Sequence, residues 1–384
     1  MRVRLADVFR SVADEPVFSR LPSAVGRAFR DVMRCRTVDL GGHWSECENG
    51  HVITRHYNAC RNRSCPRCAY HRRMKWLERQ ARLLLGCAHH HVIFTVPHEL
   101  NQLWRHNYRV LGALLFESAR QAIFTLAADP KYLGAIPGVL MALHTWGQQL
   151  FLHPHVHTVI TAGGARLGGG WIVARRRALF PFKPLQILFR ETFCHGLLRL
   201  AQHGRLRLPQ GWDTARVKQL CRDLRQRHWN VEVRERYENP TAVLNYLGRY
   251  LSGGPISETR LLAMDEESVC FRYKDNRSEG LGGVPLKVMR LSRREFVRRV
   301  LQHVPPRGFH MVREYGLYRR GAGLSTELRD EASKVVPLHP EVLLALTRRL
   351  PPVETVIPTH CPICGKPVFL RSRPRPGEVQ ARAA

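Results

Sequence analysis

The sequence predicts an α+β protein in which a small metal-held domain precedes a larger domain with a central antiparallel sheet. Strand patterns such as "HHHVIFTVP" and "LFLHPHVHTVI" are mixed with helix patterns, an order typical of α+β folds. Residues 35–75 are rich in Cys, His, Arg and Gly but poor in apolar residues, which indicates a segment that metal must hold together. The chain has 384 residues, 44% of them hydrophobic, which is enough for two or three domains with real cores.

The first half of the chain supplies the N-terminal helices and a run of strand patterns. Residues 1–34 are predicted to be helical, with a break around Pro16 and Pro22. The segment "RMKWLERQARLLLG" predicts a basic amphipathic helix that ends at Gly86. We then expect a strand in "HHHVIFTVP", a helix over 99–128, strands over 138–144 and 150–160, and a hairpin turn in "AGGARLGGGW".

The second half continues the mixture of helices and strands. We expect helices over 184–204 and 213–227, a strand in "WNVEVRE", and a strand pair in "VCFRYKD" and "VPLKVMRL". Ser292 and Glu295 form a capping box that starts a helix, and Pro305 and Pro306 stop it. The tail after about residue 371 is expected to be disordered.

The charge of the chain indicates a polyanionic partner. There are 61 Lys and Arg against 31 Asp and Glu, a net charge of +30. A surplus of this size costs self-repulsion and is not needed for folding. Because the basic residues lie along the whole chain, they favour a nucleic-acid channel over a membrane-anchoring patch. The alternative is a generally basic protein with no such partner.

The localisation that the sequence favours is a reducing cytoplasm. The start, "MRVRLADVFRSVADEP", has no long apolar run and no small-residue cleavage site, so no signal peptide is expected. No apolar segment approaches the roughly 20 residues of a membrane span, so no membrane partner is expected. The eleven cysteines are an odd number, and several have metal-ligand spacing rather than disulfide spacing.

The segment "CENGHVITRHYNACRNRSCPRC" predicts a structural zinc site. Cys65 and Cys68 are separated by two residues, a spacing that lets two thiolates bind one tetrahedral Zn²⁺. Cys47, His51 and Cys60 compete for the other two places. The preferred set is Cys47, Cys60, Cys65 and Cys68, with His51 as the competitor for one place. Basic residues surround these ligands and could contact phosphates: Arg61, Arg63, Arg67, Arg72 and Arg73.

The C-terminal segment "HCPICG" carries Cys361 and Cys364 at the same two-residue spacing. This is half of a tetrahedral site, and the sequence does not name its other ligands. A second zinc site and an unrelated cysteine pair therefore both stay open.

Three histidines alternate in "LFLHPHVHTVI", which covers residues 150–160. In a strand, alternation places His153, His155 and His157 on one face, where two imidazoles could share a divalent ion. Val156 would then face the core. The alternative is a half-exposed strand whose histidines are simply solvated.

The segment "NPTAVLNYLGRYLSGG", residues 239–254, predicts a helix with Asn239 as N-cap. Tyr246 and Tyr250 are four residues apart, so their phenols project from the same side. Arg249 lies beside them and is a candidate phosphate ligand, or a solvated arginine. The alternative for the two tyrosines is packing at the edge of the core.

These features together fit one chemistry. A tyrosine can attack a DNA phosphodiester and release a 3′-hydroxyl while a divalent cation polarises the phosphate. The tyrosine phenol has a pKa of about 10, and the metal and nearby cations must therefore favour the phenolate. The phosphotyrosine ester conserves the bond energy, so strand joining needs no nucleotide cofactor.

The chain resembles the HUH-type (His-hydrophobe-His) two-tyrosine insertion-sequence transposases, which move by rolling-circle single-strand transfer. The resemblance covers about residues 30–320. It is carried by "CRNRSCPRC", "VIFTVPHELN", "LHTWGQQLFLHPHVH", "YLGRYLSGGPIS" and "EFVRRVLQHVPPRGFHMVREYGLY". The family more often has Cys-x-x-Cys where this chain has "CENGH", which leaves the place of His51 open.

The resemblance implies an HUH endonuclease-like catalytic domain over 87–320, after a zinc-binding, DNA-contacting domain over 35–86 and before a C-terminal region over 321–384. It assigns metal binding to His155 and His157 and nucleophilic attack to Tyr246 and Tyr250. The third ligand is left open: His144 is the candidate, with Gln148 and His153 behind it. Mg²⁺ and Mn²⁺ both suit the site. His310, Arg313 and Tyr315 are candidate DNA contacts, with surface packing as the alternative. The triplet His89-His90-His91 is expected to be a solvated entry to a strand, with a metal site as the alternative.

The predicted function is nicking and rejoining of single-stranded DNA at transposon ends. The nearest alternative is a replication initiator or relaxase with the same chemistry. An alternative of another class is a zinc-dependent DNA-binding protein without catalysis, which would bind DNA but form no covalent adduct. The sequence leaves the DNA recognised, the order of the two tyrosines and the oligomeric state open.

Overall fold

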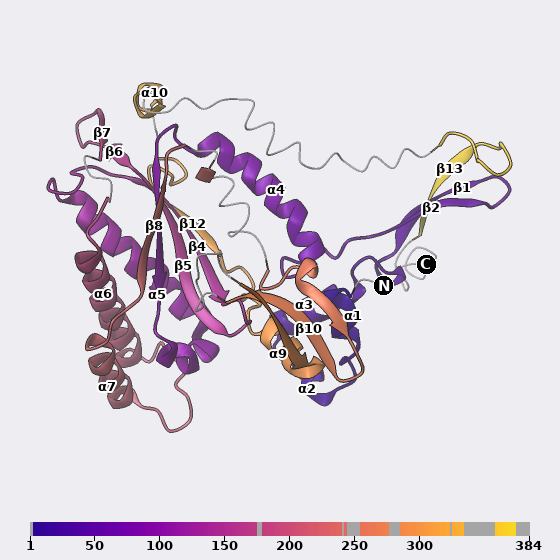
Figure 1. The fold of residues 1–384 in the computed structure, drawn as a ribbon, viewed down its shortest axis with the longest axis horizontal. Coiled ribbons are helices and arrows are strands. Elements are labelled where there is room, and N and C mark those ends of the chain that lie inside the picture. Colours follow the sequence, from indigo (N-terminus) through magenta and orange to yellow (C-terminus); the bar gives the residue numbers. More distant parts are fainter. Residues whose placement is uncertain are drawn as a thin grey trace, which may run out of the picture. The chain divides into compact units, whose positions relative to one another are not determined.

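A computed structural model describes residues 3–174, 179–239, 242–243, 254–275, 285–322, 325–333 and 358–373 of the chain. The chain divides into two compact units. The first unit comprises residues 1–73, 256–304 and 347–384, and the second comprises 74–255 and 305–346. The predicted domains follow the sequence in order, whereas in the structure residues 256–304 fold with the N-terminal segment. The α+β fold class is confirmed by helices and antiparallel sheets (Figure 1) and by a Cys-rich N-terminal region.

The second unit is built on a five-stranded antiparallel sheet with the order β12-β4-β5-β3-β8. The strands are β3 (His89–Thr95), β4 (Gly138–Trp146), β5 (Leu152–Thr161), β8 (Val231–Tyr237) and β12 (Val312–Gly316). The predicted strands over "HHHVIFTVP", 138–144, 150–160 and "WNVEVRE" are thus all present. The strand with the alternating histidines, β5, lies in the middle of the sheet.

Three helices cover one face of this sheet: α5 (Asn101–Ala128), α6 (Phe182–Gln202) and α7 (Thr214–Arg225) (Figure 1). Val156 and Ile160 of β5 point to this layer and are buried in one core with Phe116 and Phe189. Among the described helices, the one over His98–Ala128 is long and apolar enough to cross a membrane. Much of it is buried in this core, which is the packing of a core helix.

The other face of the sheet is covered by a second, smaller core. It gathers Leu84 and Leu85, which follow helix α4 (Pro66–Leu83), against Leu140 of β4 and Val159 of β5. The predicted glycine-rich hairpin is formed by β6 (Gly163–Ala165) and β7 (Trp171–Val173), and the backbone N–H of Trp171 donates to Glu331 in α10 (Thr326–Ser333). A short 3₁₀ turn, η2 (His98–Leu100), precedes α5.

The first unit packs the N-terminal helices α1 (Leu5–Arg10), α2 (Pro16–Ser19) and α3 (Ser23–Arg34) with a later three-stranded sheet and helix. The later elements are β9 (Leu261–Met264), β10 (Ser268–Lys274), β11 (Leu286–Ser292) and α9 (Arg293–Leu301). The rings of Phe9 and Phe29 pack at a tilt of 30°, and Phe271 meets Phe296 edge to face. The sequence did not predict β9 and the 3₁₀ turn η3 (Glu258–Arg260) before it.

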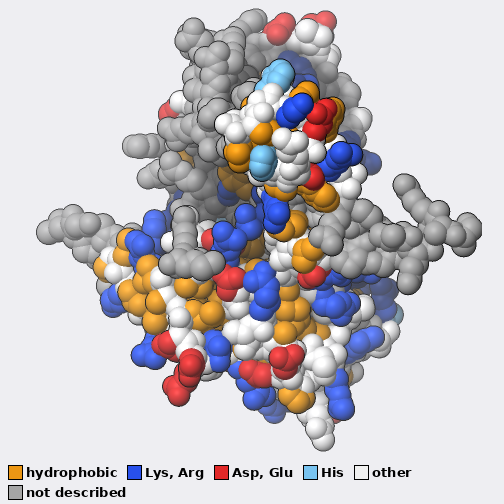
Figure 2. Space-filling view, turned by 90° about the vertical axis from the view of Figure 1, so that its right-hand side faces the viewer, with side chains coloured by type: hydrophobic (Ala, Val, Ile, Leu, Met, Phe, Trp, Pro, Cys, Tyr) orange, Lys and Arg blue, Asp and Glu red, His pale blue; other side chains and the backbone are white. Residues whose placement is uncertain are grey.

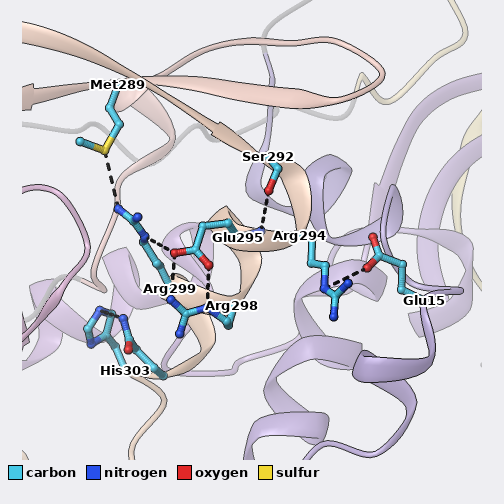
Figure 3. A network of polar contacts seen from close by, with 9 residues as sticks. Glu15, Met289, Ser292, Arg294, Glu295, Arg298, Arg299 and His303 are labelled. Carbon is cyan, nitrogen blue, oxygen red and sulfur yellow. Dashed lines mark hydrogen bonds and ion pairs between the residues drawn. The ribbon is translucent and has the colours of Figure 1, made fainter. Parts of the chain in front are cut away.

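Helix α9 begins at the predicted N-cap, Ser292, but the Glu295 side chain of the predicted capping box pairs with arginines instead. The Ser292 hydroxyl accepts a hydrogen bond from the backbone N–H of Glu295, at 3.2 Å (Figure 3). The Glu295 carboxylate pairs with Arg298 and Arg299, each at 2.6 Å, and these charges lower its pKa to about 2. Arg294 reaches Glu15 at the start of α2, 3.7 Å away, and so ties the helix to the N-terminal segment (Figure 3).

The Cys- and His-rich part of the first unit contains a second three-stranded sheet, with the order β13-β1-β2. A 3₁₀ turn, η1 (Val38–Leu40), leads into β1 (Gly42–Cys47), which pairs with β2 (Val52–Tyr57) and β13 (Val368–Arg373), both antiparallel. Strand β13 begins ahead of the tail that was expected to be disordered, and residues from 374 onward lie outside the described part.

Candidate active site and metal centres

Three histidines converge on the face of the second-unit sheet that is opposite α5. His155 and His157 alternate on β5, and His144 of β4 pairs directly opposite His155. All three side chains are buried, and their ligand nitrogens lie within 4.8 Å of one another. Val156, between the two strand histidines, faces the α5 layer, as the alternation predicted.

Hydrogen bonds set which nitrogen each imidazole presents. His155 Nδ1 donates to the backbone carbonyl of His153 at 2.7 Å, so its Nε2 carries the lone pair. That Nε2 lies 3.1 Å from His157 Nε2. His157 Nδ1 is 3.2 Å from Nε2 of His91, on the neighbouring strand β3. Both Nε2 atoms therefore point to the same small volume.

The surroundings keep these histidines neutral. Burial, reinforced by the neighbouring His144, holds the pKa of His155 and of His157 well below the ordinary value. Neutral imidazoles are metal ligands, and three of them suit a divalent transition ion such as Mn²⁺. The donor set therefore fits a divalent metal ion. The ring of Trp146 stacks on His144, with the ring centres 4.6 Å apart, and holds it in place.

Among the candidate histidines for the third place, His144 and not His153 gathers with His155 and His157. The structure brings His144 to the pair, whereas Gln148 lies in the turn between β4 and β5 and the His153 side chain is exposed. His153 contributes its carbonyl instead, which orients His155.

Tyr246, Arg249 and Tyr250 lie outside the described residues, but the start of their predicted helix is described. The Asn239 side chain accepts from the backbone N–H of Ala242 at 2.9 Å, as expected of an N-cap. Val243, four residues after the cap, is fully buried in the same small core as Ala142 and Val159. Ala142 pairs with His157 across the sheet. The chain thus enters the tyrosine segment on the histidine face.

The predicted zinc ligands fall into two groups, and this corrects the preferred set. Cys60, Cys65 and Cys68 gather with Cys35, which ends α3 and was not predicted. The Cys35 sulfur lies 3.6 Å from the sulfurs of both Cys65 and Cys68, and the Cys60 sulfur lies 3.5 Å from that of Cys68. Four sulfurs around one Zn²⁺, each about 2.3 Å away, would be separated by about 3.8 Å, so this group fits a tetrahedral zinc ion.

Cys47 and His51 do not join that group. They lie instead with Cys361 and Cys364, the half site of the C-terminal segment. The competition between Cys47 and His51 for one place therefore does not arise, because both residues belong to a different cluster. None of the eleven cysteines forms a disulfide.

Comparison with known proteins gives the family. Residues 138–324 match a family model described as "Putative transposase", and residues 5–96 match one described as "Transposase zinc-binding domain". The chain is 36% identical over 320 residues, 81% of its length and 79% of the relative's, to "Putative transposase y4qJ" of Sinorhizobium fredii (strain NBRC 101917 / NGR234). The chain belongs to the HUH-type, two-tyrosine insertion-sequence transposases.

A second relative of this transposase is "Transposase for insertion sequence element IS801" of Pseudomonas savastanoi pv. phaseolicola. It is 29% identical over 351 residues, which cover 87% of this chain and 80% of the relative. No solved structure matches the transposase. The zinc-binding family model covers all four residues of the Cys35 cluster, but it ends far before Cys361.

The predicted DNA contacts of the transposase differ in how exposed their side chains are. Arg61 and Arg63 are exposed beside the Cys35 cluster, Arg67 is half-buried there, and His310 is exposed. Arg313 of β12 instead lies over the ring of Phe116, 4.4 Å from its centre, on the α5 face of the sheet. This position favours packing over the predicted DNA contact. Figure 2 shows Lys and Arg side chains spread over one face of the transposase rather than gathered in one patch.

The structure also changes the interpretation of three histidines that the sequence placed on a solvated strand. His89, His90 and His91 are buried in β3, so the expectation that they are solvated is wrong. Strand β3 is interior, and only its pairing with β5 brings His91 against His157. Three adjacent histidines carry no alternation, so no pattern in the sequence separates His91 from its neighbours.

Proposed function

We propose that this transposase nicks and rejoins single-stranded DNA at transposon ends through a 5′-phosphotyrosine intermediate. The observation that supports the proposal is the face of the sheet that His144, His155 and His157 share. Val243, three residues before Tyr246, is buried in the core on the same face. A metal site and a nucleophile segment would then act on one phosphate.

The chain's own residues have separate roles in this reaction. His144, His155 and His157 would hold a divalent ion, Mg²⁺ or Mn²⁺, and when bound it would polarise the scissile phosphate and stabilise the leaving 3′-oxygen. The phenol oxygen of Tyr246 or Tyr250 forms a bond to phosphorus, its proton passes to solvent, and the bond from phosphorus to the 3′-oxygen breaks. The 3′-oxygen takes up a proton and becomes a free hydroxyl.

Rejoining reverses the same exchange of bonds. A 3′-hydroxyl attacks the phosphotyrosine, the new phosphodiester forms, and the phenol leaves, so no nucleotide cofactor is consumed. Two tyrosines allow one strand to stay covalently held while a second strand is cut. Arg249 would stabilise the phosphate between the two phenols. The Cys35 cluster, with zinc bound, would position Arg61 and Arg63 for contact with the DNA backbone.

Family membership favours this role over a replication initiator or relaxase, which share the chemistry. A covalent-adduct assay tests it against a DNA-binding protein without catalysis. The full chain is incubated with a single-stranded oligonucleotide carrying an element end and with Mn²⁺ or Mg²⁺, and adducts are separated under denaturing conditions. We expect an adduct with the native chain and none when Tyr246→Phe and Tyr250→Phe are combined.

Two controls sharpen this assay. Tyr237→Phe removes a phenol that stacks on His91 but is no proposed nucleophile, so adduct should persist in that variant. Mass-spectrometric mapping of the native adduct should place the DNA on Tyr246 or Tyr250. Adduct that survives in the double variant would overturn the assignment.

A further inference from the structure

The C-terminal segment meets the N-terminal hairpin at a cluster of four metal-ligand side chains. Cys47 and His51 flank the turn between β1 and β2, and Cys361 and Cys364 precede β13. Their ligand atoms lie within 4.8 Å of one another. Residues 47 and 361 are more than 300 positions apart, so chain proximity does not explain the gathering. All four lie in the first unit.

The distances within this cluster are those of a tetrahedral site. Cys47 Sγ is 3.5 Å from His51 Nδ1 and 3.6 Å from Cys364 Sγ. Cys361 Sγ is 3.7 Å from the same His51 nitrogen. Sulfurs and a nitrogen about 2.3 Å and 2.0 Å from one ion are separated by roughly these distances. Three thiols and one imidazole form a closed donor set that suits zinc.

Hydrogen-bonded backbone turns bring the ligands together in both segments of the cluster. At the C-terminal end, the N–H of Ile363 donates to Cys361 Sγ at 3.4 Å and the N–H of Gly365 donates to the Cys361 carbonyl at 2.8 Å. Gly365 has a φ of 68°, which favours glycine. At the other end, Gly50, with a φ of 78°, closes the turn that brings His51 back to Cys47.

The sheet that carries the cluster lacks a hydrophobic core. Within β1, β2 and the described side chains of β13, the buried residues are Gly42, Ser45 and Cys47. Phe369 and Leu370 of β13 are exposed, at 45% and 63%. Three short strands with so little burial cannot offset their loss of conformational entropy, so another interaction must hold β13 on β1.

We propose that Cys47, His51, Cys361 and Cys364 bind a second structural zinc ion. This site is distinct from the Cys35 cluster, and it holds the C-terminal strand on the N-terminal hairpin. Zinc binding contributes folding free energy directly when the apo segment cannot fold, so the ion takes the place of the missing core. The chain would therefore carry two zinc ions, one within the zinc-binding domain that the family model covers and one that bridges to residues beyond it.

Zinc stoichiometry of the purified full chain tests the proposal. Native mass spectrometry should give two zinc ions per native chain and one for Cys361→Ser combined with Cys364→Ser. Cys65→Ser combined with Cys68→Ser should also keep one. Cys270→Ser, which changes a half-buried cysteine of β10 outside both clusters, should keep two. One zinc ion in the native chain, or two in the Cys361/Cys364 variant, would overturn the proposal.

Thiol alkylation of the native chain covers the case in which a variant fails to fold. Before a chelator is added, Cys361 and Cys364 should be protected from iodoacetamide, although Cys364 is partly exposed. After chelation their rate of modification should rise at least tenfold, while that of Cys270 stays unchanged. Equal rates at Cys361 and Cys364 with and without chelator would contradict a metal at this site.

Discussion

At the scale of single residues, His91 orients the imidazole of His157 through a hydrogen bond with its Nδ1. For Nε2 of His157 to bind the ion, its Nδ1 must carry the proton and donate to His91 Nε2, 3.2 Å away. His91 stacks on Tyr237 of β8, which keeps its ring in place. His91 is therefore a positioning residue for the proposed metal site and does not touch the ion itself.

Replacing His91 by Phe keeps a ring of similar shape but removes the acceptor. We expect the affinity for Mn²⁺, measured by titration calorimetry, to fall about 10–100-fold, as for other partners of metal-bound histidines. Adduct formation should recover at saturating Mn²⁺, which a merely unfolded variant would not show. His203→Phe serves as control, because His203 is exposed at the end of α6, in the helix layer on the opposite face of the sheet. Unchanged affinity in His91→Phe would refute the positioning role.

The candidate site was predictable from the sequence where ligands follow a local period. Alternation on one strand placed His153, His155 and His157 on one face, with Val156 turned to the core, and the family resemblance selected His155 and His157. The zinc ligands show the limit of that reasoning. Cys35 lies 25 positions before Cys60 at the end of a helix, with no knuckle spacing to mark it. Cys47 was placed with the nearest cysteines in sequence, whereas its partners come from the other end of the chain.

At the scale of elements, β3 shows why its histidines were misjudged. It is an interior strand between β5 and β8, covered on both faces, so polar residues there are buried rather than solvated. Nε2 of His89 lies 2.5 Å from the Tyr318 hydroxyl on one side, and His90 points to the other. Strand β13 was not predicted, because "VFLRSR" is mostly exposed and its Arg and Ser residues resemble those of the C-terminal tail that follows.

Burial of these histidines makes stability depend on pH. Burial lowers the pKa of His89 to about 3 and that of His90 to about 4. In the unfolded chain both histidines should have a pKa of about 6.5. Between these values the unfolded chain binds more protons than the folded one. These histidines therefore do not reduce the free energy of unfolding above about pH 7, but they lower it progressively as the pH drops toward 4.

A His90→Leu variant tests this contribution. The thermal unfolding midpoint of the native chain should fall between pH 7.5 and pH 5, and the fall should be smaller in the variant because one titrating group is gone. The matched control is His203→Leu, at the exposed end of α6. An equal pH dependence in native chain and His90→Leu would contradict the role assigned to His90.

At the scale of the whole molecule, the net charge of +30 is spread over both units rather than placed in one arm. Each phosphate contact made by Lys or Arg releases condensed counterions, so the logarithm of the binding constant should fall linearly with the logarithm of salt concentration. For a single strand the slope is about −0.7 per contact, so six contacts would give roughly −4. A DNA-binding protein without catalysis would show the same slope, which is why only the adduct separates the two functions.

The share of the zinc-binding domain in this charge effect can be measured separately. Arg61→Ala combined with Arg63→Ala removes two exposed cations beside the Cys35 cluster and should make the slope shallower by about 1.4. Most of the slope should remain, because the other basic residues are distributed along the chain. Arg10→Ala is the control: Arg10 already pairs with Asp7 at 2.8 Å, so its loss should leave the slope unchanged. Fluorescence anisotropy with a labelled single strand, at several salt concentrations, gives both values. A slope that Arg61 and Arg63 do not change would place the DNA elsewhere on the transposase, away from the Cys35 cluster.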